Sequence, residues 1–343
     1  MRIRALDSIR GLLLLQMTLD HFGKPISTYL YECFGFFSAA EGFFFLSGFV
    51  GMLAATSKQA KDPGQSWMRK RAFKIWQYHV LTLLAIAIAA TTVLTNIYPL
   101  FKEMEHHLVP SILLSALLVH TPEWLDVLPL YVIFLIVGSL VFPLYARAVN
   151  PRTVYLLFLP SLALWAASQA GLRDWLNSLF PSWVHHGDFD PFAWQFIYFL
   201  GAAVATWWRL CKEHAKWFSA FTPVVILLLV FSFLWSHQML PLAPPADVLI
   251  DKTHLGLLRF SNFFLFVLFV SWIVRTWPSA LDFRVTNLIG RHSLDVYTAH
   301  IVFIYLWLAM PPGIRYRSPW NVIVPLVVCA LLWGLSKIRE PRS

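Results

Sequence analysis

The first hydrophobic segment of the chain carries an arginine and a histidine on one helix face. Arg10 and His21 are eleven residues apart, and eleven steps of about 100° return to within about 20° of three full turns. In a helix the two side chains would be separated by about 16 Å along the axis. A guanidinium at one end and an imidazole at the other suit an extended anionic ligand. A snorkelling arginine and a histidine bound to a backbone carbonyl are the simpler alternative.

A carboxylate stands in the second hydrophobic segment, next to three consecutive phenylalanines. Glu41 must therefore be protonated or paired. If the first two segments are antiparallel neighbours, Glu41 reaches a depth close to that of His21. A carboxylate that orients an imidazole is the usual arrangement for a general base, so we predict that His21 and Glu41 are catalytic. A purely structural pair is the alternative. The nearby Ser47 and Gly48 are typical of close helix packing.

Two further groups of polar residues are candidates for binding. Arg71 and Lys74 are three residues apart and share a helix face, where they could hold phosphates or simply fix the topology. Ser293, Tyr297 and His300 form one stripe at i, i+4 and i+7, which could line a cavity or bond to neighbouring helices.

Asp7 and Asp20 in the first segment are also candidate cavity residues. The histidine pairs in the loops lack a further ligand at a suitable spacing, so we expect no metal site.

The composition is that of a membrane protein. Of 343 residues, 58% are hydrophobic and only 13% are charged, about half the charged fraction of an ordinary soluble domain. These values exclude a soluble enzyme, a disordered scaffold and a nucleic-acid-binding domain. The net charge of +9 is then interpreted as the positive-inside bias of a membrane protein rather than as a site for a polyanion.

A membrane-spanning helix needs about 20 mostly apolar residues. The sequence predicts ten such helices in a single all-α unit over residues 1–343, at 9–29, 34–56, 76–97, 127–147, 153–171, 192–209, 217–238, 257–277, 294–310 and 320–337. The apolar stretch Leu108–Val119 is too short to cross and is predicted to be interfacial or re-entrant. With both termini in the cytoplasm, twenty lysines and arginines lie on the inner side and seven on the outer side.

Taken together, these residues resemble the acyltransferase-3 superfamily of membrane acyltransferases. Arg10 and His21 match its N-terminal signature, and Glu41 with the following Phe45-Leu46-Ser47-Gly48 matches its second segment. Arg71 and Lys74 resemble its basic pair, with lysine in place of the more usual arginine.

Within that superfamily the chain is most similar to the OpgC branch. Three stretches carry this likeness: Asp126-Val-Leu-Pro129-Leu-Tyr131, Asp190-Pro-Phe-Ala-Trp194-Gln195 and Asp251-Lys252-Thr-His254-Leu-Gly256-Leu-Leu-Arg259. The resemblance implies O-acylation of an extracytoplasmic glycan from cytoplasmic acyl-CoA, in the bacterial inner membrane. For OpgC proteins it implies succinylation of osmoregulated periplasmic glucans, with succinyl-CoA as co-substrate and no tightly bound cofactor.

The resemblance also implies roles for the candidate residues. Arg10, Arg71 and Lys74 would hold the CoA phosphates, and His21, polarised by Glu41, would deprotonate a sugar hydroxyl. Transient acylation of His21 is an alternative mechanism. A transporter or flippase for a glycan or lipid-linked substrate is the alternative function, because several membrane spans with buried charge suit it as well.

Overall fold

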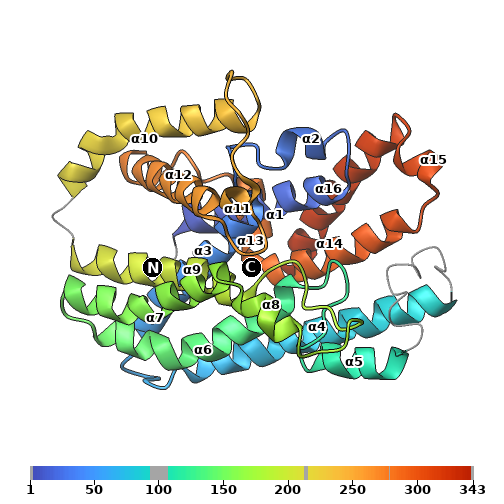
Figure 1. The fold of residues 1–343 in the computed structure, drawn as a ribbon, viewed down its shortest axis with the longest axis horizontal. Helices are drawn as coiled ribbons and strands as arrows, with labels where there is room; N and C mark the ends of the chain where they lie inside the picture. Colours follow the sequence, from blue (N-terminus) through green and yellow to red (C-terminus); the bar gives the residue numbers. More distant parts are fainter. Residues whose placement is uncertain (1–2, 93–106, 212–214, 278, 341–343) are drawn as a thin grey trace.

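The computed structural model describes residues 3–92, 107–211, 215–277 and 279–340. Within these ranges the protein is helical, and the only β-type pairing is an isolated bridge between Thr121 and His186. Most of the long helices run along the longest axis of the molecule (Figure 1). This arrangement is the one expected of a helical bundle that crosses a membrane.

Ten long helices correspond one to one with the ten predicted segments. They are α1 Arg4–His21, α3 Ala39–Lys58, α4 Ser66–Thr92, α6 Val127–Arg147, α7 Pro151–Gln169, α9 Pro191–Leu210, α10 Ala215–Ser236, α12 Leu257–Thr276, α14 Ser293–Leu308 and α16 Trp320–Arg339. The short helices are α2 Ser27–Leu30, α5 Leu108–Ala116, α8 Leu172–Asn177, α11 Asp247–Ile250, α13 Arg284–Arg291 and α15 Pro312–Arg315. Residues 93–97 of the third predicted segment lie outside the described ranges.

Five of the described helices are long and apolar enough to cross a membrane, namely α3, α4, α6, α12 and α16. Two apolar helical stretches, Ala220–Ser236 and Ser293–Leu308, are slightly shorter. The protein therefore has the helices of a membrane protein, and the remaining predicted crossings stay predictions. Helix α5 has nine residues and is about 14 Å long, less than half the hydrocarbon thickness.

Several segment boundaries differ from the predicted ones; helix α4, for example, begins at Ser66 and not at residue 76. The first helix was expected to run to residue 29, but α1 ends at His21 because Gly23 adopts a left-handed φ of 84° and Pro25 follows it. The second helix was expected from residue 34 and begins at Ala39. Glu41 is therefore in the first turn of α3, not two turns inside it.

Glycines allow the closest contacts between helices. A Cβ atom at Gly48 of α3 would lie 1.8 Å from the carbonyl oxygen of Tyr198 on α9, so the predicted packing role of Gly48 is confirmed. Helix α13, which the sequence did not predict, is held against α1 in the same way. A Cβ atom at Gly11 would lie 1.9 Å from the carbonyl oxygen of Thr286. These contacts fix α1, and with it Arg10 and His21, to the body of the protein.

Candidate active site

His21 lies on the wall of a cavity of about 80 Å³ where α1 meets the loops that precede α3 and α6. We call it the His21 cavity. Its side chains include four carboxylates, four aromatic rings and one lysine. These are Asp20, Glu123, Asp126 and Asp188; Tyr31, Trp124, Phe189 and Tyr297; and Lys252. Such a combination of hydrogen-bond acceptors and flat apolar rings suits a polyhydroxylated ligand.

Two aromatic side chains hold the imidazole of His21. The ring of Trp124 meets it edge-on, with centroids 4.8 Å apart, and the ring of His300 stacks on it at 5.5 Å. The Nδ1 atom of His21 is buried without a hydrogen-bond partner among the described residues. His21 therefore keeps a ring nitrogen that the surrounding protein leaves unused.

A hydrogen bond to a backbone carbonyl determines which ring nitrogen of His300 carries the proton. Its Nδ1 lies 2.5 Å from the carbonyl oxygen of Tyr297, which can only accept, so Nδ1 holds the proton. Its Nε2 atom is then the bare acceptor nitrogen, and it too is buried without a partner among the described residues. Two stacked imidazoles with unused nitrogens thus lie beside one cavity.

Glu41 does not contact His21 as predicted. One of its carboxylate oxygens forms an ion pair with Nε of Arg259. The other accepts hydrogen bonds from the backbone N–H and the hydroxyl of Ser38, at 3.0 and 2.8 Å. The carboxylate is fully buried and occupied by these donors. The predicted His21–Glu41 pair is therefore wrong, because Glu41 caps its own helix and neutralises an arginine instead.

Arg259 is the residue that sequence reasoning missed. It is 1% exposed, and besides Glu41 it binds Glu32, with Nη1 2.6 Å from Oε1. The signal was available: Arg259 enters an apolar segment, as Glu41 does, and both were expected near the same membrane surface. A buried charge requires an opposite charge, so the two could have been matched.

The carboxylates of the His21 cavity crowd one another. The backbone N–H of Asp188 donates to Oδ2 of Asp126, at 3.1 Å. Burial, and then the charge of Asp188, raise the pKa of Asp126, which precedes α6, to about 6. Burial and Asp188 also raise the pKa of Glu123. This cavity therefore holds a proton on Asp126 under mildly acidic conditions.

Lys252 is placed by a loop that two of the family-like stretches build together. The indole of Trp194 donates to the carbonyl oxygens of Lys252 and Thr253, at 3.0 and 3.1 Å. Asp251 caps the same loop by accepting from the backbone N–H groups of Thr253 and His254. The ammonium of Lys252 lies over the rings of Phe189 and Tyr31, with Nζ 5.1 and 5.8 Å from their centroids.

A second cavity, of about 30 Å³, holds the basic residues. We call it the Arg10 cavity. Arg10 and Arg71 line it together with polar side chains of α3, α6 and α14, namely Ser47, Tyr131, Ser293 and Tyr297. Arg10 also pairs with Asp7, with Nη1 3.5 Å from Oδ1. Asp7 and Lys74 are part of the lining of neither cavity, and Nζ of Lys74 lies 5.8 Å from the ring centroid of Tyr78.

Tyr297 lines both cavities. Tyr297 is 3% exposed, and its ring packs against those of Phe43 and His300, with centroids 6.1 and 4.7 Å away. The predicted stripe of Ser293, Tyr297 and His300 thus faces the site. Ser293 lines the Arg10 cavity, Tyr297 lines both cavities, and His300 stacks on His21.

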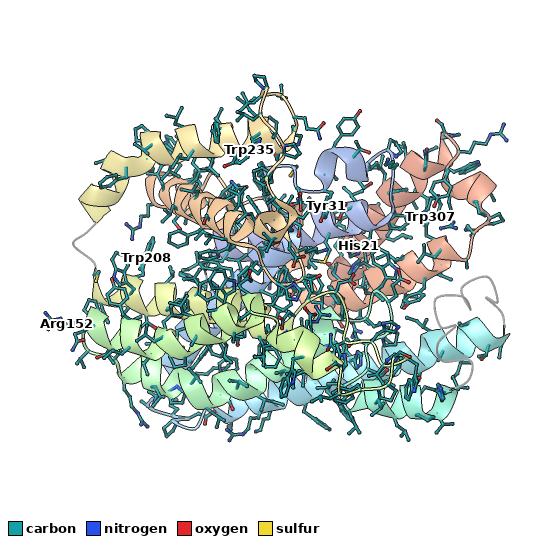
Figure 2. All side chains as sticks on the ribbon, in the orientation of Figure 1. His21, Tyr31, Arg152, Trp208, Trp235 and Trp307 are labelled. Atoms are coloured by element: carbon teal, nitrogen blue, oxygen red, sulfur yellow. The ribbon has the colours of Figure 1, made fainter. Side chains whose placement is uncertain are left out.

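The two ends of the molecule differ in the labelled residues they carry. Figure 2 shows His21 and Tyr31 near one another to the right of the centre, and Trp208 and Arg152 towards the left end. The predicted inner loops include Arg152 and Arg209. His21 therefore lies away from the end that carries Arg152.

Comparison with known proteins agrees with the likeness of the motifs. No curated protein matches the chain. The family model described as OpgC protein matches residues 2–343, which is nearly the entire chain. The chain belongs to the OpgC family.

Proposed function

We propose that the protein is a membrane O-acyltransferase that moves an acyl group from cytoplasmic acyl-CoA to a hydroxyl of an extracytoplasmic glycan. The observation that carries the proposal is that Tyr297 forms a wall of two cavities, one with Arg10 and Arg71 and the other with His21. An anionic donor and a polyhydroxylated acceptor can thus approach the same point from opposite sides. Membership of the OpgC family supports this chemistry.

The orientation is part of the proposal. The ten long helices would cross the inner membrane of a bacterium as one unit with both termini in the cytoplasm. The distribution of twenty basic residues on the inner side against seven on the outer side supports it. The Arg10 cavity then faces the cytoplasm, and the His21 cavity faces the periplasm.

The donor end would bind acyl-CoA through its phosphates. Arg10 and Arg71 supply guanidinium groups, which bind phosphate in a bidentate manner. Lys74 would add a point charge outside the cavity. The pantetheine arm would run along α1 past Tyr297, so that the thioester carbonyl reaches His21. Displacement of the Tyr297 ring would open the wall between the cavities.

In the reaction, His21 removes the proton from a sugar hydroxyl as its oxygen attacks the thioester carbonyl. The carbon–sulfur bond then breaks, and the CoA thiolate leaves and takes up a proton. His300, stacked on His21 and fixed by its hydrogen bond to the Tyr297 carbonyl, holds the His21 ring in the orientation that proton transfer needs. In the alternative order, His21 attacks first and is itself acylated.

The acyl group is the finer part of the proposal. The OpgC resemblance implies a succinyl group, which has a free carboxylate at its far end. Lys252 lines the cavity that contains His21, and its ammonium forms no ion pair within 4 Å among the described residues. This ammonium would bind the succinyl carboxylate, while the surrounding carboxylates and rings bind the glucan acceptor.

The decisive experiment uses purified protein in detergent with succinyl-CoA and a periplasmic glucan. Release of free CoA thiol that depends on both the glucan and His21, with a succinyl ester on the product, is the expected result. Absence of thioester cleavage in detergent, together with movement of the glucan across the bilayer by the same protein reconstituted in liposomes, would instead establish the transporter or flippase. Cleavage in the absence of glucan at the full rate would show that the glucan is not the acceptor.

A further inference from the structure

A third cavity, the apolar slot, lies apart from the two described above. It has a volume of about 180 Å³ and is walled by α1, α3, α9 and α12. Its α12 wall is one helical stripe that includes Val270, Ser271 and Val274. Among the described residues, the hydroxyl of Ser271 and the indole N–H of Trp208 are the only polar side-chain groups in the lining.

The slot exists because α12 packs against the body of the protein along only half of its length. Near its beginning, α12 joins the body through Arg259 and through aromatic pairs such as Phe263 with Phe37, whose centroids are 5.5 Å apart. The buried residues of α12 end at Val267. Beyond that point the helix stands away from α3 and α9, and the slot fills the wedge between them. In Figure 1, α12 lies beside α10, and α9 runs below both.

The open end of the wedge carries aromatic and cationic groups at the level where a membrane surface is expected. Trp208 lines the slot there, and the guanidinium carbon of Arg275 lies 3.3 Å from its ring centroid. Ile3, which precedes α1, lines the same end, and the neighbouring Arg4 side chain is 79% exposed. Tryptophan and arginine at the end of a spanning helix are typical of the headgroup region.

We propose that the apolar slot is a binding site for one phospholipid of the leaflet on the side of the N-terminus. Its acyl chain lies between α12 and the α1–α3–α9 wall, and its phosphate contacts Arg275. Water is not expected to fill the apolar slot, because an apolar cavity stays dry. A hydrocarbon chain fits the lining, and an anionic phosphate complements the cation at the mouth. The lipid thus fills the wedge that direct helix packing leaves between α12 and the rest of the protein.

Native mass spectrometry of the full chain, purified from nanodiscs of phosphatidylglycerol, tests the site. The wild type should retain one phosphatidylglycerol per chain. Val270→Trp fills the slot and should lower this retention by more than about tenfold, because several buried methylene groups lose their contacts. Leu268→Trp is the matched control, since Leu268 is on the same helix but outside the slot lining, and it should retain the lipid. Ser271→Phe provides a milder filling variant if Val270→Trp does not fold.

The headgroup contact is tested separately. Arg275→Gln should weaken retention of phosphatidylglycerol about fivefold and leave that of an uncharged galactosyl diacylglycerol with the same chains unchanged. Equal retention in the wild type and both filling variants would overturn the proposal. So would a dimer mass lost in Val270→Trp, which would make a second copy the occupant. A retained mass equal to acyl-CoA would assign the slot to the donor instead.

Discussion

The imidazole rings of His21 and His300 are stacked with their centroids 5.5 Å apart and their planes inclined by 23°. His21 comes from the end of α1 and His300 from the middle of α14, so the pair joins two helices nearly 280 residues apart in sequence. The pair occupies the place that the sequence assigned to His21 and Glu41. The first two predictions follow from this exchange of partners.

His21→Ala should lower the rate of acyl transfer by about 10²–10⁴, the usual cost of losing a general base. His300→Ala should also be impaired, and the double variant should be little worse than His21→Ala, because residues that act as a unit show non-additive losses. The measurement is kcat for CoA release by folded protein. His237→Ala, at the exposed end of α10, is the control. Additive losses would mean that the two histidines act independently.

Glu41→Gln should act mainly on stability. It leaves Arg259 with only Glu32 as a countercharge, and we expect a loss of about 3 kcal/mol, the lower end of the cost of breaking a buried pair. Thermal unfolding in detergent measures this. The matched control is Asp282→Asn, which removes the exposed ion pair with Arg4 and should cost less than about 1 kcal/mol. A Glu41→Gln protein with normal stability and no activity would restore Glu41 to the catalytic machinery.

Arg71 and Lys74 should differ in donor binding, although they share a helix face. Arg71 lines the Arg10 cavity and Lys74 does not. Arg71→Gln should therefore raise KM for acyl-CoA about tenfold, the loss of one charge-assisted hydrogen bond, with a smaller change for Lys74→Gln. Steady-state kinetics at varied donor concentration distinguish them. Equal effects would show that the phosphates lie outside the cavity.

Asp126 should make stability depend on pH. Its pKa is raised to about 6 in the folded protein from the ordinary value of 3.8. Between these values the folded state binds the proton more tightly than the unfolded state, so stability falls as pH rises from about 4 to 6 and is level above. In Asp126→Asn this contribution is absent. The difference in Tm, wild type minus variant, should therefore decrease over that range, and a difference that increases would reverse the assignment.

Topology reporters test the orientation. A fusion after Lys70 or Arg284 should be cytoplasmic, and one within 98–122 or 175–190 should be extracytoplasmic, because of the charge distribution. Each reporter is paired with one that is active only on the other side. A cytoplasmic reporter near residue 180 would contradict ten crossings and imply that the stretch Leu108–Val119 crosses as well.

The approximate positions of the long helices were predictable because apolar runs of spanning length mark them. Helix α6 begins and ends where the sequence placed it, at Val127 and Arg147. Helix α13 was not predictable in the same way, since its eight residues depend on contacts with α1, among them the close approach of Gly11 and the hydrogen bond between Ser8 and Thr286. Its existence depends on tertiary packing that no local pattern reports.

The candidate site was predictable in its residue types but not in its pairings. His21, Tyr297 and Arg10 do face cavities, because polar groups in apolar helices need a polar environment. Which polar side chains contact one another depends on the rotation of each helix about its axis and on its depth in the membrane. A five-residue error in the start of α3 was enough to move Glu41 from His21 to Arg259. Loop residues such as Lys252 gave no periodic signal at all.

The contact of Gly11 with Thr286 fixes α1 in place, so that α1 holds Arg10 and His21 at a constant separation. With the helix unbroken from Arg4 to His21 and fixed to α13, the axial distance between the guanidinium of Arg10 and the imidazole of His21 is set at about 16 Å. If Arg10 holds the phosphate of the donor and the thioester must reach His21, donors are selected by the length of the arm between the phosphate and the thioester. Shortened thioesters would then react slowly even when saturating, since remote binding energy is what brings the carbonyl to the base.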